Sequence, residues 1–248
     1  MTPLNLTKVN PKAVETIRPF FEQILSTHQA KIHSLVVTGS AITEDFNSSK
    51  SDVNSIIILK DMDLKFLEEI APLGKKFGKK KVAAPLIMTP DYITESLDVF
   101  PIEFLNFKII HQTAYGNEIL DSIEIERHDL RHQCEREIKT KLIGLRQGYL
   151  SSQADPQLLS EKFIAVITSD IPLFRALMFL LRQESVIQVN KVIQTLSTAV
   201  AINTDPFFKA QQIKQNVLKP SMAEFNTIFE NYYSAFEKLG KIVNEISI

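Results

Sequence analysis

The spacing of apolar side chains changes once along this chain, close to residue 126. Before that point, short runs of β-branched and aromatic residues alternate with turn-forming residues, a pattern typical of strands. Beyond it, apolar residues recur at steps of three and four, a pattern typical of helices. We therefore expect an α+β domain over residues 1–125, a mixed sheet with flanking helices, and an all-α helical bundle over residues 126–248. The strands are predicted at residues 33–38, 52–59, 82–88 and 100–110.

Capping residues and prolines predict where several helices begin. Asn10 followed by Pro11 is typical of a helix start, because the asparagine caps the helix and proline fits its first position. A second helix is predicted over residues 64–73, followed by a basic turn that reaches Lys81. Asp129 is the expected cap of the first bundle helix, and Asp155 before Pro156 predicts the start of the next.

Composition excludes several classes of protein. The chain has 28 Lys and Arg against 29 Asp and Glu, so no bulk positive charge favours a nucleic-acid partner. Its single cysteine, Cys134, can form no internal disulfide and is expected in the core of its helix. The longest apolar stretches are too short to cross a bilayer, and residues 1–10 lack the apolar core of a signal peptide. We expect a cytoplasmic protein without a membrane partner.

The residues that point to chemistry lie around the first two predicted strands. Gly39 and Ser40 follow the first strand, where glycine allows close backbone approach and the turn offers N–H and hydroxyl groups to a phosphate. Asp52 and Asn54 are two apart on the second strand, so their side chains share a face. Oxygen ligands in that arrangement suit Mg²⁺ beside a triphosphate. Glu103, on the predicted fourth strand, is the candidate for a third ligand.

The stretch from Leu35 to Leu59 resembles the signature of the DNA polymerase β-like nucleotidyltransferase superfamily: an apolar strand, Gly-Ser, a variable loop, and an Asp-x-Asp pattern on a second apolar strand. The nearest resemblance is to bacterial aminoglycoside-type nucleotidyltransferase-domain proteins, in which a helical domain follows the catalytic one. It implies a nucleotidyltransferase-like fold that uses Mg²⁺ to transfer a nucleoside monophosphate from a nucleoside triphosphate to a hydroxyl of a small molecule. Carried over, Asp52 is a catalytic metal ligand, Gly39 and Ser40 contact phosphate, and Glu103 is a third metal ligand or general base.

One departure from that signature changes the expected function. The second acid of the pattern falls on Asn54, whose amide oxygen can ligate a cation but brings no charge. Removing one anion weakens the binding of metal ions beside a triphosphate, so transfer is expected to be weakened. The alternative is a catalytically inactive nucleotide-binding or regulatory protein on the same fold, or an interaction module, with a homodimer as a further expectation. His128 and His132 have metal-compatible spacing but lack a supporting glutamate, which favours a surface or interdomain role.

Overall fold

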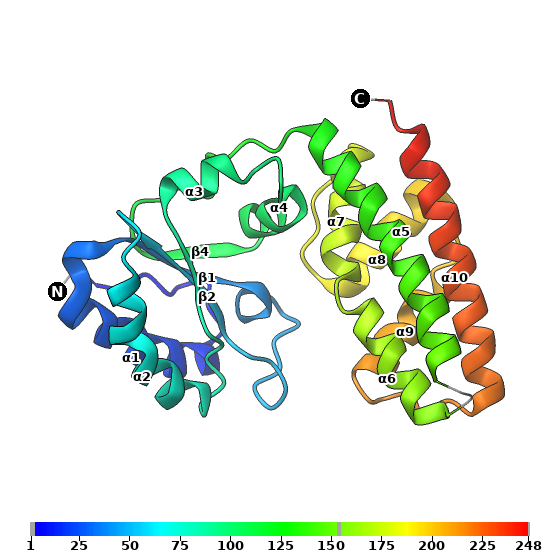
Figure 1. Cartoon of the computed structure of the whole chain (residues 1–248), viewed down its shortest axis with the longest axis horizontal. Helices are drawn as coiled ribbons and strands as arrows, with labels where there is room; N and C mark the ends of the chain where they lie inside the picture. Colours follow the sequence, from blue (N-terminus) through cyan, green and yellow to red (C-terminus); the bar gives the residue numbers. More distant parts are fainter. Residues whose placement is uncertain (1–2, 153–154, 248) are drawn as a thin grey trace. The chain divides into compact units, whose positions relative to one another are not determined.

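The computed structural model describes residues 3–152 and 155–247. The chain forms two compact units, each with its own core (Figure 1). Residues 3–98 and 104–124 make the first unit, and residues 99–103 and 125–247 belong to the second. The expected fold class is confirmed, because a mixed sheet with flanking helices is followed by a helical region.

The sheet of the first unit has the strand order β3-β2-β1-β4. Strand β1 lies antiparallel to both β2 and β4, whereas β2 and β3 are parallel. Most neighbouring elements in this unit are joined by short connections, as is usual in compact domains, but a longer loop over residues 43–53 leads into β2. The elements are α1 (Pro11–His28), β1 (Ile32–Thr38), a 3-10 helix η2 (Gly39–Ile42), β2 (Asn54–Leu59), α2 (Leu64–Gly78), β3 (Leu86–Met88), α3 (Pro90–Glu95), α4 (Pro101–Ile109) and β4 (His111–Gly116).

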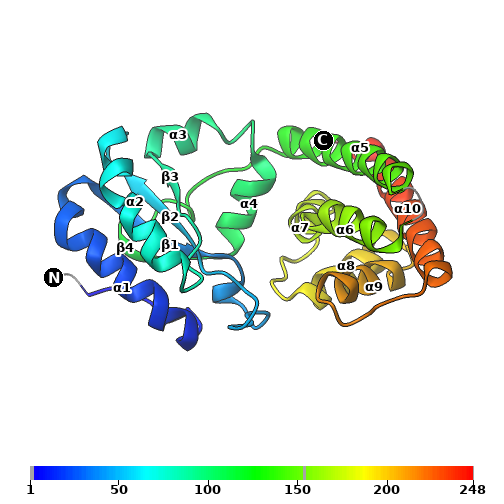
Figure 2. The same ribbon diagram turned by 60° about the horizontal axis from the view of Figure 1, so that its bottom comes forward.

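Helices α1 and α2 pack on one face of this sheet and contribute nearly half of the buried apolar residues in its core (Figure 2). Helix α1 starts as predicted, with the Asn10 side chain accepting a hydrogen bond from the backbone N–H of Lys12. Its fully buried residues recur at helical steps and pack with Leu35, Val37 and Ile57 of the sheet. Each large apolar side chain buried in this way contributes roughly 1.5–3 kcal/mol to folding. This core holds β1 and β2 in place at the centre of the sheet, and with them the turn that follows β1.

The predicted strand at residues 100–110 is wrong, because that segment forms helix α4. Its alternation of apolar and polar residues resembles a strand, but Pro101 suits the first turn of a helix and buried residues recur at helical steps. The fourth strand is β4, which follows at once. Its second residue, Gln112, is polar yet buried, and hydrogen bonds to Asn5, Thr7 and the Lys8 backbone satisfy it.

Two further boundaries differ from the prediction. Helix α2 continues to Gly78, so Lys75 and Lys76 lie in its last turn, where cations favour the negative end of the helix dipole. The predicted basic turn is therefore largely helical. The third strand is shorter than expected, and ahead of it Val82 makes a single parallel bridge to Val53.

The second unit is a bundle in which α5 packs against α6, α7 and α10. Helix α5 begins at Arg127, so Asp129 is a first-turn residue and the prediction that it caps the helix is wrong. Asp155 caps α6 as predicted, and Ser221 with Glu224 forms a capping box on α10. The helices are α5 (Arg127–Ser151), α6 (Pro156–Ile167), α7 (Asp170–Leu180), α8 (Val189–Val200), α9 (Asp205–Lys214) and α10 (Met222–Glu245).

A buried polar cluster lies inside the bundle. The Lys141 ammonium is 3.0 Å from a carboxylate oxygen of Asp170, and the Tyr232 hydroxyl donates to the other oxygen at 2.6 Å. Burial raises the pKa of the Asp170 carboxyl despite the Lys141 charge. By length and hydropathy the stretch Pro156–Leu180 resembles a membrane span, but it comprises two helices and is more than half buried. Buried helices of a bundle commonly have a comparable hydropathy. Cys134 is buried, as expected.

Candidate functional site

The β1–β2 hairpin brings the Gly39-Ser40 turn against Asn54. Thr38, the last residue of β1, pairs with Asn54, the first residue of β2. Gly39 has φ +74°, a conformation that glycine adopts at little cost. A β-carbon at this position would lie only 3.2 Å from Asn54 Nδ2 and 3.9 Å from Asn54 Cβ. The turn therefore lies directly beside the Asn54 side chain.

Asp52 and Asn54 face solvent on one side of their segment. Both are exposed, whereas the intervening Val53 and the following Ser55 are buried. This alternation is what an extended backbone produces, so the two side chains share a face as predicted. The hydroxyl of Ser55, on the buried face, has no hydrogen-bond partner. Polar groups that could meet a ligand thus lie on the exposed side, beside the turn.

The loop that precedes β2 is tied down by polar contacts. The Asn47 side chain accepts from the Ser49 backbone N–H at 3.0 Å, and Asn47 N–H donates to Ser51 Oγ at 3.1 Å. The Lys81 ammonium donates to the Ser49 carbonyl. The Val53 N–H donates to the Lys81 carbonyl at 2.8 Å. Contacts from the β3 side therefore hold the loop that leads into Asp52.

The residues present fit one Mg²⁺ shared with phosphate better than a two-metal arrangement. Asp52 supplies one charge and Asn54 a neutral oxygen. Across residues 3–152 and 155–247, the one set of three converging His, Cys, Asp or Glu ligands does not include Asp52. Magnesium is commonly held by one or two carboxylates with substrate phosphates, whereas two-metal catalysis needs several anions.

Glu103 lies in a different setting from the one predicted. It is exposed on the first turn of α4, and its Oε2 accepts a hydrogen bond from Gln133 Nε2 at 2.8 Å. Gln133 also binds the Ile102 N–H, and all three residues belong to the second compact unit. The strand that would have carried Glu103 towards Asp52 does not form. A role for Glu103 as a metal ligand or base stays a prediction without that geometric support.

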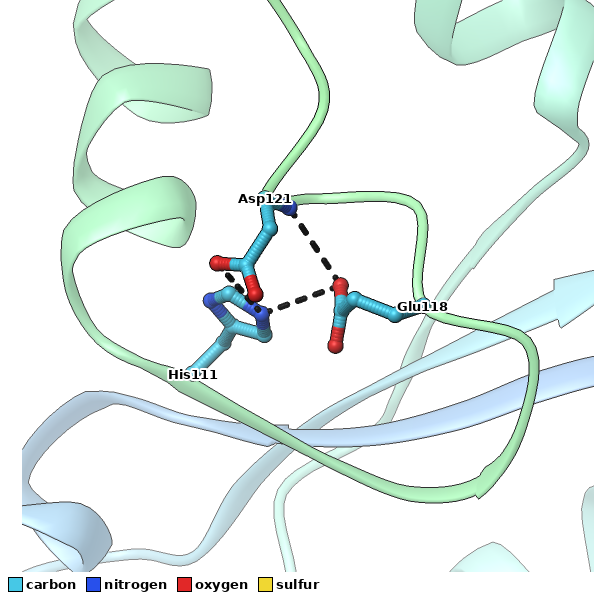
Figure 3. Close-up of side chains that lie close together, drawn as sticks. All are labelled: His111, Glu118 and Asp121. Carbon is cyan, nitrogen blue, oxygen red and sulfur yellow. Dashed lines mark hydrogen bonds and ion pairs between the residues drawn. The ribbon is translucent and has the colours of Figure 1, made fainter.

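The sequence did not reveal a second group of ligating side chains in the first unit. His111 opens β4, and Glu118 and Asp121 come from the loop after this strand; their ligand atoms lie within 4.8 Å of one another (Figure 3). His111 has no recognisable partner in the sequence, because its setting depends on a strand predicted in the wrong place. The signal in the sequence is the short distance along the chain from His111 to Glu118, which indicates a shared site only once β4 is placed between them.

The group at His111 is at the same end of the sheet as Asn54. Thr38 pairs with Asn54 on one side and with His111 on the other. Directly paired residues point to the same face of a sheet. Neighbouring strands are about 4.8 Å apart, so the backbones of Asn54 and His111 are separated by roughly 10 Å.

His128 and His132 lie one turn apart on α5, as their spacing predicts. Their ring centroids are 4.1 Å apart, and His128 Nδ1 is 3.3 Å from an Asp129 carboxylate oxygen. The His128 side chain is 63% exposed, so a surface role fits it. This pair is a useful reference for any experiment on histidine ligands elsewhere in the chain.

No protein-family model and no curated protein matches the chain. Among solved structures, its fold is similar to that of a spectinomycin adenyltransferase from Enterococcus faecialis, crystallised with ATP and spectinomycin. The two chains share 10% identity, and the match covers 89% of this chain and 98% of the other, with a TM-score of 0.40.

Proposed function

We propose that this protein binds a nucleoside triphosphate at the β1–β2 hairpin, on a nucleotidyltransferase-type core, and transfers nucleotide slowly or not at all. The observation that carries the proposal is the close approach of the positive-φ Gly39 turn to Asn54, at 3.2 Å for a hypothetical β-carbon. A turn whose positive φ favours glycine, beside exposed oxygen ligands, suits the binding of phosphate. The proposal rests on this geometry and on the motif in the chain.

Each residue of the hairpin has a distinct part in this binding. The turn at Gly39 and Ser40 would present backbone N–H groups and a hydroxyl to the phosphates, as turns with one left-handed residue do for anions. Asp52 would be the charged protein ligand of one Mg²⁺ that the phosphates also hold. Asn54 would offer its amide to the phosphate or the ion. Mg²⁺, when bound, would neutralise phosphate charge.

Weak transfer follows from the number of charges at the site. Activating an acceptor hydroxyl and stabilising a leaving pyrophosphate both require concentrated positive charge, which in turn requires several carboxylates to hold it. Asp52 is one such carboxylate, and the third ligand predicted at Glu103 lacks a strand to position it. Binding without efficient transfer is therefore the better-supported of the two functions. The small-molecule acceptor, the homodimer and the cytoplasmic location stay predictions.

Calorimetry on the full chain tests the binding. We expect ATP, or another nucleoside triphosphate, to bind in the presence of Mg²⁺ and to bind weakly to Asp52→Asn. Asp61→Asn is the matched control, because it removes the same charge beyond the opposite end of β2 and should leave affinity unchanged. Absence of binding for a panel of four triphosphates, or equal binding by both variants, would contradict the proposal.

The variant Asn54→Asp tests whether the missing charge limits the site. A second carboxylate beside Asp52 should tighten Mg²⁺-dependent binding about tenfold, since two anions attract the cation more strongly than one. Pyrophosphate release with a panel of small hydroxyl acceptors should be at background in the natural chain and should rise in Asn54→Asp. Rapid release by the natural chain would instead assign it the transferase function.

A further inference from the structure

The side chains of His111, Glu118 and Asp121 converge at the end of the sheet, beside the start of β4 (Figure 3). His111 Nε2 lies 3.1 Å from Glu118 Oε1 and 3.7 Å from Asp121 Oδ1. In a tetrahedral zinc site with ligand bonds of about 2.0–2.2 Å, neighbouring ligand atoms are about 3.3–3.6 Å apart. The two separations from His111 lie on either side of that range, and all three ligand atoms are within 4.8 Å of one another, so side-chain movements would bring them to the spacing of a metal site.

The histidine ring is oriented as a metal ligand requires. His111 Nδ1 is 3.2 Å from the Lys108 carbonyl oxygen, which can only accept, so the tautomer with its proton on Nδ1 satisfies this contact. In the neutral ring Nε2 then has the free lone pair, and it points at the two carboxylates. A backbone carbonyl that fixes the tautomer in this way is the usual outer contact of a metal-binding histidine.

Glu118 is also held in place before any ion binds. Its Oε1 accepts from the backbone N–H groups of Leu120 at 2.8 Å and Asp121 at 3.3 Å. Its Oε2 accepts from the Thr113 hydroxyl. The loop after β4 therefore presents this carboxylate to the ring with little remaining freedom, which lowers the entropic cost of binding.

The site is closed on one side and open on the other. The His111 side chain is 6% exposed, whereas that of Asp121 is 73% exposed. An ion could enter past Asp121, and water could occupy a fourth position. One imidazole with two carboxylates suits zinc-type transition metals, since Mg²⁺ and Ca²⁺ favour oxygen ligands alone.

We propose that His111, Glu118 and Asp121 form a binding site for one divalent transition-metal ion of the zinc class, with an open coordination position. The site is separate from the hairpin and does not depend on nucleotide binding. The competing interpretation is an ion pair between a protonated His111 and the two carboxylates, which needs no metal.

Titration of the full chain with Zn²⁺, after dialysis against a chelator, tests the proposal. We expect one ion per chain, and affinity reduced at least about 100-fold in His111→Gln and Asp121→Asn, since even outer contacts of metal sites cost 10–100-fold when lost. The matched control is the double variant His128→Gln/His132→Gln, which removes the exposed pair on α5 and should retain the site. Asp121→Asn is the variant least able to disturb folding, because this side chain is largely exposed.

Cobalt provides a second measurement that a purely structural ion pair would not affect. Co²⁺ in a four-coordinate site of nitrogen and oxygen ligands absorbs strongly in the visible range, and the absorbance should disappear in Asp121→Asn while circular dichroism is unchanged. Absence of Zn²⁺ binding by the natural chain would overturn the proposal in favour of the ion pair. Binding that survives Asp121→Asn but disappears in the α5 double variant would overturn it as well.

Discussion

Two polar clusters occupy the same end of one sheet, and the chain holds them very differently. At the hairpin, Asp52 and Asn54 are exposed and carry one charge between them. Two strands away, His111 and Glu118 are fixed by a carbonyl, two backbone N–H groups and a hydroxyl. The difference indicates that oriented ligands are at β4, whereas the hairpin supplies a glycine turn with few charges. Ligand number and orientation, more than position in a motif, determine what each cluster can bind.

The largest effect should come from Gly116→Ala, which distinguishes the two clusters because Gly116 lies in β4, the strand that carries His111. Gly116 has φ +83°, and a β-carbon there would lie 2.0 Å from the His33 carbonyl oxygen, closer than any real contact. The left-handed conformation and the clash together should cost about 2–5 kcal/mol in the free energy of unfolding, measured with urea. Zn²⁺ binding should weaken because β4 must shift away from β1. A stable variant that binds Zn²⁺ normally would show that β4 does not position the site.

Gly39→Ala should have a smaller effect, confined to the hairpin. The φ of +74° costs alanine about 1–2 kcal/mol, but the nearest atom is the end of the Asn54 side chain, which can move aside. Nucleotide affinity should fall because the β-carbon displaces the Asn54 amide, which the proposal places beside the phosphate or the ion. Zn²⁺ affinity, measured on the same sample, should stay unchanged and serves as the internal control. Equal losses of both ligands would mean that the clusters are not independent.

Local sequence signals predicted the hairpin well. An apolar β-branched run that ends at Gly39, followed by an apolar run after Asn54, specifies two antiparallel strands and a turn without help from distant residues. The caps at Asn10 and Asp155 were likewise readable, because a cap depends on its immediate neighbours. The exposed Asp-x-Asn face follows directly from strand periodicity.

Distant contacts explain what the sequence did not predict. Strand β4 buries Gln112, a residue that propensity places on a surface, because partners at Asn5, Thr7 and Lys8 lie more than 100 positions away. The apolar residues after Phe100 looked like the strand instead, which led to the wrong setting for Glu103. The cluster at His111 depends on β4 and on the loop after it, so it could not be found before that strand was placed.

A third and weaker perturbation, Lys81→Met, tests how firmly the hairpin loop must be held. The Lys81 ammonium donates to the Ser49 carbonyl. Loss of this hydrogen bond should lower the free energy of unfolding by at most about 1.5 kcal/mol. Methionine keeps most of the aliphatic length, so packing should be retained. We expect nucleotide affinity to fall a few-fold by calorimetry while Zn²⁺ affinity is unchanged. Lys79→Met, an exposed residue nearby, is the control and should alter neither value.

The smallest effect is the dependence of stability on pH at Glu118, measured with a chelator present so that no metal contributes. Burial acts to raise the pKa of the Glu118 carboxyl, but the Thr113 hydroxyl, the His111 charge and two backbone N–H groups together lower it. A lowered folded-state pKa stabilises the fold above the unfolded value of about 4.3 and loses that contribution as pH falls through the folded value.

The natural chain should therefore exceed Glu118→Gln in unfolding free energy at pH 6 by under about 1 kcal/mol, because the carboxylate is partly exposed and screened. The difference should shrink as the pH is lowered below about 4, where the glutamate becomes protonated. Glu124→Gln, a change at an exposed glutamate in the same loop region, should show no such trend. A difference that grows on acidification would mean that Glu118 is destabilising as an anion. The loop after β4 would then hold unfavourable charge until a cation bound, which would strengthen the contrast with the hairpin.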